Sequence, residues 1–304
     1  MLDVVGVGAN SVDYVYRLPE FPAPDSPRAK IRIAHHGTSC GGQTATTLCT
    51  CAAMGLRTRY VGTTGNDENG RLMRAELARR GVDITRTAVR SANNAFAVIL
   101  LDEAQGERVV LWDRASRLDL APGEIDPGVI GDARLLHVDD VDGEASIRAA
   151  SMAREAGLPV TSDIERVGDR TEALIAAVTI PIFADHVLEP LTGETDFERA
   201  LRTLRRRHQG MLCVTLGARG AMLLDGDRLH HEPAFPVAVS DTTGAGDVFR
   251  GAFIAALLRG ASPEDILRCA NAAAAISCTR LGAINGVPTP AETQALATTR
   301  AKTD

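Results

Sequence analysis

The chain has 304 residues and a formal net charge of −6 at pH 7, with 45% hydrophobic and 24% charged residues. This length suffices for one large α/β domain or two modest ones. An acidic balance argues against a protein that coats nucleic acid, which is normally basic. No apolar stretch approaches the ~20 residues of a membrane span, and the chain opens on an apolar strand pattern without a charged leader. We therefore expect a cytoplasmic protein that binds neither nucleic acid nor membrane.

The first third of the chain predicts short strands and two helices. Residues 4–8 form an apolar run that ends in glycine, as in a buried strand. Residues 28–36 alternate charged and aliphatic side chains with the period of a half-exposed strand. Small residues over 44–54 predict a tightly packed helix followed by a glycine. A short strand over 59–62 and an amphipathic helix over 70–80 come next.

A hairpin is predicted in the middle of the chain. Strand-like patterns over 96–102 and 107–113 flank a turn at 103–106. Together with residues 28–36, these strands predict a small antiparallel sheet that stands apart from the main core.

From residue 133 onward, strand patterns alternate with helix patterns. This rhythm indicates a mainly parallel sheet with helices on both faces. We expect one α/β domain over 1–304, with a β lid formed by insertions around residues 10–40 and 92–114. The predicted elements of the second half are strands at 135–140, 159–164, 180–186 and 211–217, a hairpin at 221–232, and helices at 144–156, 171–178 and 197–207.

The segment most informative for chemistry is SDTTGAGDVF at 240–249, which leads into a long apolar helix pattern over 248–258. Gly244, Ala245 and Gly246 have almost no side chain, so backbone N–H groups can approach a ligand closely. A helix N-terminus adds unpaired N–H donors and a partial positive charge, which suits the negative charge that develops on a phosphoryl group. Asp247 is placed to take the proton of an attacking hydroxyl. The alternative interpretation is that Asp247 only caps the helix.

Several segments resemble one enzyme family. Residues 241–253, DTTGAGDVFRGAF, resemble the second signature of the PfkB, or ribokinase-like, carbohydrate kinases. Residues 41–46, GGQTAT, resemble the first signature, in which two glycines precede a substrate-facing helix. Asp13, residues 214–220 and Asn271 match further family positions, so the resemblance extends along nearly the whole chain. It implies a ribokinase-like three-layer α/β/α fold and an ATP-dependent kinase that phosphorylates a hydroxyl of a small sugar.

The resemblance also implies roles for individual residues. Asp247 is then the catalytic base, with Gly244, Ala245 and Gly246 in the anion hole. The implied sugar-binding residues are Asp13, Gly41, Gly42, Gln43, Thr46 and Arg114. The implied nucleotide-binding residues are Thr215, Gly217, Gly220 and Asn271. Thr46 stands where the family commonly has asparagine, so one bidentate contact to the sugar hydroxyls is weakened or replaced.

Metal ions follow from the same resemblance. Family members often hold a monovalent cation, here K⁺, with backbone carbonyls near the anion hole. The matching positions are Asp241, Thr243, Cys278, Leu281, Ala283 and Gly286. The family's Asn-x-x-Glu motif, linked to Mg²⁺ and phosphate, is not intact in ADHVLEP at 184–190. Glu189 or Asp185 is a candidate for the acidic role. Alternatively, Asp185 ends a strand and Glu189 caps the next turn.

The substrate is less well specified. Residues 106–114 are similar to the hairpin of ketohexokinases, whereas residues 45–47 and 278–288 look more like sulfofructose kinases. The preferred acceptor is therefore a ketose such as fructose or a 6-substituted fructose. Alternating cations at Arg28, Lys30 and Arg32 would share one face of the strand predicted over 28–36. That face would read a phosphate or sulfonate on the sugar, or else form a solvated or interface edge.

Other functions stay open at this point. A nucleoside kinase or a 2-keto-3-deoxygluconate kinase would share the fold, although this chain has few aromatic residues to surround a base. A non-catalytic sugar- or nucleotide-binding protein is disfavoured by the retention of Asp247 with its glycines. The partial dinucleotide fingerprint VGVGAN at 5–10 lacks its third glycine and a following helix pattern, which argues against an oxidoreductase. We also expect a homodimer that forms through the lid.

Overall fold

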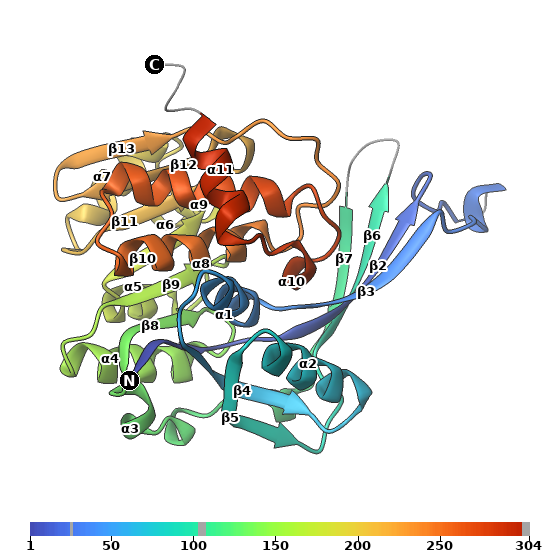
Figure 1. Ribbon diagram of the computed structural model, residues 1–304, viewed down its shortest axis with the longest axis horizontal. Coiled ribbons are helices and arrows are strands. Elements are labelled where there is room, and N and C mark those ends of the chain that lie inside the picture. Colours follow the sequence, from blue (N-terminus) through green and yellow to red (C-terminus); the bar gives the residue numbers. More distant parts are fainter. Residues whose placement is uncertain (25–26, 103–107, 300–304) are drawn as a thin grey trace.

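The computed structural model describes residues 1–24, 27–102 and 108–299. Within this part of the chain, a nine-stranded sheet has the order β13–β12–β11–β10–β9–β8–β1–β4–β5 (Figure 1). All neighbours from β5 to β11 are parallel, and β12 and β13 are antiparallel. The strands are β1 Leu2–Val7, β4 Thr58–Gly65, β5 Val82–Arg90, β8 Ala133–Asp139, β9 Val160–Ile164, β10 Ile180–Ala184, β11 Leu212–Thr215, β12 Ala221–Asp225 and β13 Arg228–Glu232.

Helices cover both faces of this sheet, which confirms the predicted three-layer α/β/α core (Figure 1). One layer contains α1 Gln43–Ala53, α2 Glu68–Arg79, α8 Ala245–Leu258 and α9 Pro263–Ser277, with α10 Ala283–Gly286 and α11 Pro290–Thr299 beside them. The other contains α3 Pro127–Ile130, α4 Gly143–Glu155, α5 Thr171–Ala177, α6 Asp185–Thr192 and α7 Phe197–Arg205. The central strands are almost entirely buried, as expected for parallel strands between two helical layers. None of the described helices is long and apolar enough to cross a membrane.

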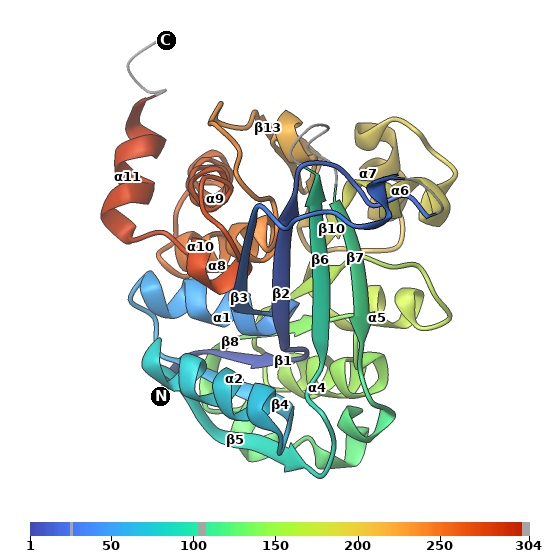
Figure 2. The same cartoon turned by 90° about the vertical axis from the view of Figure 1, so that its right-hand side faces the viewer.

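A second, four-stranded sheet has the order β3–β2–β6–β7, and Figure 2 shows its strands side by side across the front of the core. Its strands are β2 Ser11–Leu18, β3 His35–Gly41, β6 Phe96–Asp102 and β7 Arg108–Asp113. The expectation of an antiparallel sheet is wrong at one pair, because β2 and β6 are parallel. In the chain, β2 follows β1 and β6 follows β5. Because β1 and β5 run parallel in the core sheet, β2 and β6 enter the small sheet in the same direction. The predicted turn at 103–106 lies outside the described residues.

The strand predicted over 28–36 is also displaced. Residues Pro27–Ala29 form a 3₁₀ turn, and the strand begins only at His35. The reason is the length of the partner strand: β2 ends at Leu18, and its pairing with β3 stops at Arg17 opposite His35. Residues 30–34 are therefore not part of a strand, although the Ala34 N–H still donates to the Arg17 carbonyl at 2.9 Å. Lys30 and Arg32 do not form the cationic strand face that the alternation predicted.

The helix predicted over 248–258 begins three residues earlier, at Ala245. This difference matters for the chemistry, because it places Gly246 and Asp247 inside the first turn of α8. Backbone N–H groups in a first helical turn have no partner within the helix. The small residues 244–246 thus lie where the loop ends and α8 begins.

Candidate active site

The segment before α8 is held in one conformation by its own side chains. The Asp241 carboxylate, 3% exposed, accepts hydrogen bonds from the Thr243 N–H at 2.9 Å and the Thr243 hydroxyl at 2.7 Å. It also accepts one from the Gly282 N–H at 2.8 Å. The Cys278 carbonyl accepts from the N–H groups of Ser240 and Asp241. The residues predicted to hold a monovalent cation therefore lie on two segments that are bonded together, although the Cys278 carbonyl already accepts two hydrogen bonds.

Gly244 is required at the start of α8 for two reasons. Its φ of 75° lies in the left-handed region that side chains disfavour. A Cβ at this position would also lie 2.5 Å from the Cβ of Ala283. The close approach of Gly244 to Ala283 brings the start of α10 against the first turn of α8.

Asp247 is buried among charged groups that sequence reasoning missed. Its carboxylate forms a group with Asp163 and Glu165 in which oxygen atoms lie within 4.8 Å of one another. Arg250 lies beside this group, with Nη2 2.5 Å from Oδ1 of Asp163. Burial raises the pKa of Asp247 well above its usual value, and the negative charge of Glu165 adds to the shift, while Arg250 opposes it. Burial likewise raises the pKa of Asp163.

The predicted sugar-binding residues come together at the junction of β2, β3 and α1. Asp13 is 5% exposed and accepts a hydrogen bond from the Ser11 hydroxyl at 2.8 Å. A Cβ on Gly41 would lie 2.3 Å from Oδ2 of Asp13, so only glycine leaves room for that carboxylate. Gly42 has a φ of 95°, and a Cβ there would lie 2.3 Å from the Asn10 backbone. Burial raises the pKa of Asp13 to about 6.

Two polar groups at the start of α1 have no partner within the described residues. They are Nε2 of Gln43 and the hydroxyl of Thr46. Because buried polar groups are normally hydrogen-bonded, such atoms point to a ligand that the protein alone does not supply. Both residues belong to the predicted sugar-binding set.

The sugar-binding glycines and the start of α8 meet at one residue. The Cβ of Ala283 lies 2.5 Å from the Cβ position of Gly244 and 3.5 Å from that of Gly41. The Thr47 hydroxyl of α1 also donates to the Asp247 carbonyl at 3.2 Å. Packing of α1 and α10 against α8 therefore brings the two predicted signatures, which are about 200 residues apart in sequence, to one place.

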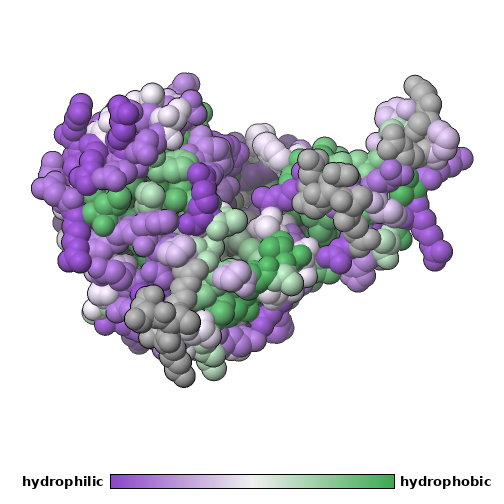
Figure 3. All heavy atoms as spheres, turned by 90° about the horizontal axis from the view of Figure 1, so that it is seen from above, coloured by the Kyte–Doolittle hydropathy of each residue, from purple (hydrophilic) through white to green (hydrophobic). Residues whose placement is uncertain are grey.

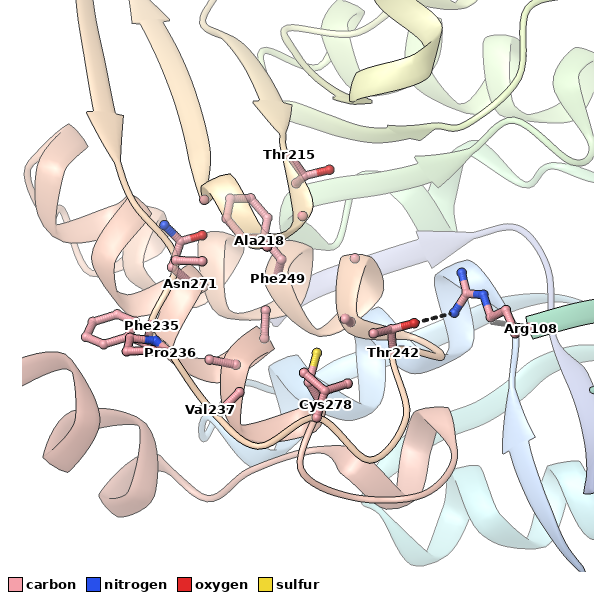
Figure 4. A pocket seen from close by; sticks show the side chains of 18 residues that line it. Arg108, Thr215, Ala218, Phe235, Pro236, Val237, Thr242, Phe249, Asn271 and Cys278 are labelled. Carbon is pink, nitrogen blue, oxygen red and sulfur yellow. Dashed lines mark hydrogen bonds between the residues drawn. The ribbon is translucent and has the colours of Figure 1, made fainter. Parts of the chain in front are cut away.

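A pocket of about 660 Å³ opens beside the first turn of α8 (Figure 4). All four residues predicted to contact nucleotide line it: Thr215, Gly217, Gly220 and Asn271. Ala245 and Gly246 form part of the same wall. The remaining lining is mainly apolar and comes from the segment after β13 and from α9, where sequence reasoning had not placed the wall; it includes Phe235, Val237 and Ala275.

One charged side chain reaches this pocket from the small sheet. Among the described lining residues, Arg108 is the only charged one. Its Nη1 donates to the Thr242 hydroxyl at 2.8 Å, as Figure 4 shows. β7 is thereby bonded to the segment that forms the start of α8. The sequence marked Arg108 only as part of a hairpin.

Two predicted site residues lie in other surroundings. Arg114 donates to the Asp142 carboxylate at 2.8 and 3.0 Å and to the Leu118 carbonyl, so its guanidinium is largely used within the protein. Glu189 is exposed near the end of α6. Asp185, the other candidate for the acidic role, forms an ion pair with Arg219 at 3.1 Å. Neither acid belongs to the carboxylate group around Asp247.

Comparison with known proteins identifies a class of small-molecule kinases over nearly the whole chain. The model of the pfkB family carbohydrate kinases matches residues 1–290, and the chain belongs to this family. It is 30% identical over 285 residues to an ATP-dependent ribose-1-phosphate kinase of Halopiger xanaduensis, covering 93% of this chain and 94% of that protein. It is 32% identical over 279 residues to fructokinase-1 of Oryza sativa, covering 83% and 86%.

Solved structures agree with this assignment. The ribokinase of Arabidopsis thaliana, in complex with ribose and ATP, superposes with a TM-score of 0.82 at 25% identity. The match covers 97% of this chain and 98% of the ribokinase. The chain is therefore an ATP-dependent kinase that belongs with the sugar and nucleoside kinases and has a ribokinase-like fold.

Proposed function

We propose that this kinase transfers the γ-phosphoryl group of ATP to a hydroxyl of a small sugar, with Asp247 as the catalytic base. The observation that carries the proposal is the position of the first turn of α8. This turn borders the pocket that contains Thr215 and Asn271, and through Ala283 it contacts the site of Gly41 and Asp13. A nucleotide and a sugar bound at these two places meet at Gly246 and Asp247.

The proposed chemistry follows from this arrangement. The sugar hydroxyl gives its proton to the Asp247 carboxylate while its oxygen forms a bond to the γ-phosphorus. The bond from that phosphorus to the bridging oxygen breaks, and ADP leaves with the electron pair. Backbone N–H groups of the first turn of α8 stabilise the negative charge on the transferring group. Arg108, the charged side chain at this pocket, is placed to neutralise the phosphates.

Metal ions enter this proposal with the nucleotide. Mg²⁺ bound to ATP supplies positive charge to the phosphates. Oε1 of Glu165 would lie 3.9 Å from a Cβ on Gly246, so this carboxylate is close to the phosphate position. We propose that Glu165 holds Mg²⁺ directly or through water. The alternative is Glu189, which the sequence comparison with the Asn-x-x-Glu motif suggested for this role. K⁺ binding by the carbonyls around Thr243 and Ala283 stays a prediction.

A ketose such as fructose, or a 6-substituted fructose, is the proposed acceptor. Asp13 and Val15 lie on the same face of β2, and their strand partners Ala97 and Ile99 share that face. The aromatic residues Tyr14 and Phe96 lie on the opposite face. The surface beside Asp13 is thus small and aliphatic, which supports a sugar acceptor over a nucleoside, whose base would need an aromatic wall.

A coupled ADP-release assay tests this proposal. The acceptors are fructose, tagatose, 6-substituted ketoses, ribose, ribose 1-phosphate, 2-keto-3-deoxygluconate and nucleosides. We expect the highest kcat/KM with a ketose. A preference for nucleosides or for 2-keto-3-deoxygluconate would replace the proposed acceptor and leave the mechanism intact. Absence of turnover with all of them, together with tight ATP binding, would favour a non-catalytic binding protein.

We also propose that two chains associate through the small sheet, which forms a lid over the site. β7 is the last strand of this sheet and exposes four consecutive apolar residues, Val109 to Trp112. In the view from above, hydrophobic side chains reach the surface of this projecting part of the molecule (Figure 3). An exposed apolar edge strand is a typical place for association with another chain.

A further inference from the structure

A buried arginine lies directly behind the proposed catalytic residues. Arg250 follows Asp247 by three positions on α8, so the two side chains lie on the same side of the helix. Only 1% of Arg250 is exposed. Arginine is almost never buried to this extent unless it is paired, so the position demands an explanation.

The guanidinium lies close to two elements of the core, where it forms an ion pair but makes no hydrogen bond within the described residues. Its Nη2 is 2.5 Å from Oδ1 of Asp163, which is fully buried on β9. Its Nη1 would lie 2.6 Å from a Cβ placed on Gly246. The arginine therefore lies between the end of β9 and the turn of α8 that carries Gly246 and Asp247. No contact with a substrate is implied by this position.

The surrounding charges show why a cation is needed here. Asp163, Glu165 and Asp247 place three carboxylates within 4.8 Å of one another. Asp140, whose carboxylate accepts from the Glu165 N–H at 2.8 Å, adds a further negative charge from the segment after β8. Asp139 and His137 of β8 and Cys213 of β11 are close enough to interact electrostatically with Asp247 or Arg250. Carboxylates this close repel one another unless a positive charge lies among them.

We propose that Arg250 is a positioning residue for phosphoryl transfer, because its guanidinium is paired with Asp163 and packs against Gly246, and so keeps Gly246 and Asp247 aligned with the acceptor hydroxyl. The inference rests on the proposed role of Asp247 as the base. A misalignment of about 1 Å at a reacting centre typically costs about 100-fold in rate. Neither Arg250 nor Asp163 lines the nucleotide pocket, and neither belongs to the Asp13 site, so binding of both substrates should change little.

The decisive test compares kcat and KM of four variants with their thermal unfolding midpoints. Arg250→Gln and Asp163→Asn each leave one buried charge without its partner, so both are expected to lower the midpoint as well as kcat. The double variant Arg250→Gln/Asp163→Asn removes both charges, and we expect its midpoint to recover toward that of the wild type. Its kcat is expected to stay about 100-fold low, with both KM values within about threefold.

Arg250→Lys is the fourth variant and keeps the buried charge. A lysine cannot reach two elements with a planar group, so we expect kcat to fall about tenfold with little change in stability. The matched control is Arg259→Gln, which removes an arginine from the far end of the same helix, where it donates to the Met54 carbonyl at 2.6 Å. This control should keep the wild-type kcat.

The possible outcomes are distinct. A double variant whose kcat lies within about threefold of the wild type would show that the ion pair serves folding only, and it would overturn the inference. A wild-type kcat in Arg250→Lys would also overturn the inference, because the contact of the guanidinium with Asp163 and Gly246 would then be unnecessary for catalysis. Asp247→Asn is measured alongside: if it stays active, the proposed base is wrong. If it is inactive while the double variant turns over normally, only the positioning role of Arg250 fails.

Discussion

At the scale of single residues, Asp247 combines burial with a place in the first turn of a helix. Its carboxylate has a raised pKa because burial and Glu165 disfavour the charged form, and a raised pKa makes the ionised group a stronger base. We predict that Asp247→Asn lowers kcat by about two to four orders of magnitude, because a positioned base is lost. Steady-state kinetics and a nucleotide-binding titration check this, and the Kd for ATP should stay close to that of the wild type.

The competing interpretation of Asp247 as a simple helix cap has its own control. Asp265 is an exposed acid in the first turn of α9 and has no other assigned role. If Asp247 only stabilised the start of α8, Asp247→Asn and Asp265→Asn would both lower stability slightly and leave kcat unchanged. Matching effects of the two substitutions on kcat would contradict the base assignment.

The proposed role of Asp13 predicts that sugar binding depends on pH. Burial raises its pKa to about 6, and the ionised carboxylate is the better acceptor for sugar hydroxyl groups. We predict that the KM for the sugar rises as pH falls through about 6, while the KM for ATP stays nearly constant. Initial rates at several pH values check this, and Asp13→Asn should remove the pH dependence of the sugar KM.

The sign of the stability effect separates weaker binding from unfolding. A carboxyl group whose pKa is raised by folding favours the folded state while it is protonated, below its ordinary pKa of 3.8. Its contribution is lost as pH rises from that value to about 6. Asp13 therefore does not destabilise the protein on mild acidification, and an increase in sugar KM near pH 6 without a lower unfolding midpoint would support the assignment. If sugar affinity and the unfolding midpoint fell together, the assignment of Asp13 to sugar binding would be contradicted.

At the scale of elements, the contact between β7 and the segment before α8 connects the small sheet to the phosphate end of the site. Arg108 makes this contact through Thr242. We predict that Arg108→Ala raises the KM for ATP about tenfold, because a charge-assisted hydrogen bond typically contributes about 1.5–3 kcal/mol. The sugar KM should change less.

The matched control for Arg108 is Arg86→Ala. Arg86 is an exposed arginine that pairs with the surface carboxylate of Asp126 at 3.6 Å, and such surface ion pairs contribute little to stability. An equal change in ATP affinity in both variants would mean that Arg108 acts only through net charge, against the proposed contact with the phosphates.

The elements also show what sequence patterns can and cannot predict. The alternation of strand and helix patterns correctly predicted the parallel core, and the glycines around Asp247 predicted a phosphate end, because both patterns depend on local chemistry. β2 was missed, and the strand at 28–36 was placed too early, because strand pairing depends on the length of a partner distant in sequence.

The charged group behind Asp247 could not be predicted for the same reason. Asp163 and Arg250 are 87 positions apart, and only the packing of α8 on the end of β9 brings them together. One local signal existed: an arginine within the apolar helix sequence VFRGAF is unusual. The partner that compensates its charge is visible only in three dimensions.

At the scale of the whole molecule, β7 gives the last prediction, that two chains associate through the small sheet. Leu111 is 56% exposed on this edge strand. We predict that Leu111→Lys shifts the protein to monomers in light scattering without lowering its unfolding midpoint, because the side chain makes few contacts within its own chain. A buried charge at a protein interface opposes association strongly.

Val89 is the matched control, because it is 52% exposed on β5, which is an edge strand of the nine-stranded sheet and not of the small sheet. Val89→Lys should leave the oligomeric state unchanged. A wild-type protein that is monomeric at high concentration would remove the proposed dimer, and dissociation by Val89→Lys instead would move the interface to the core sheet. Because the same small sheet contributes Asp13 and Arg108, a dimer through β7 should also make kcat/KM depend on protein concentration near the dissociation constant.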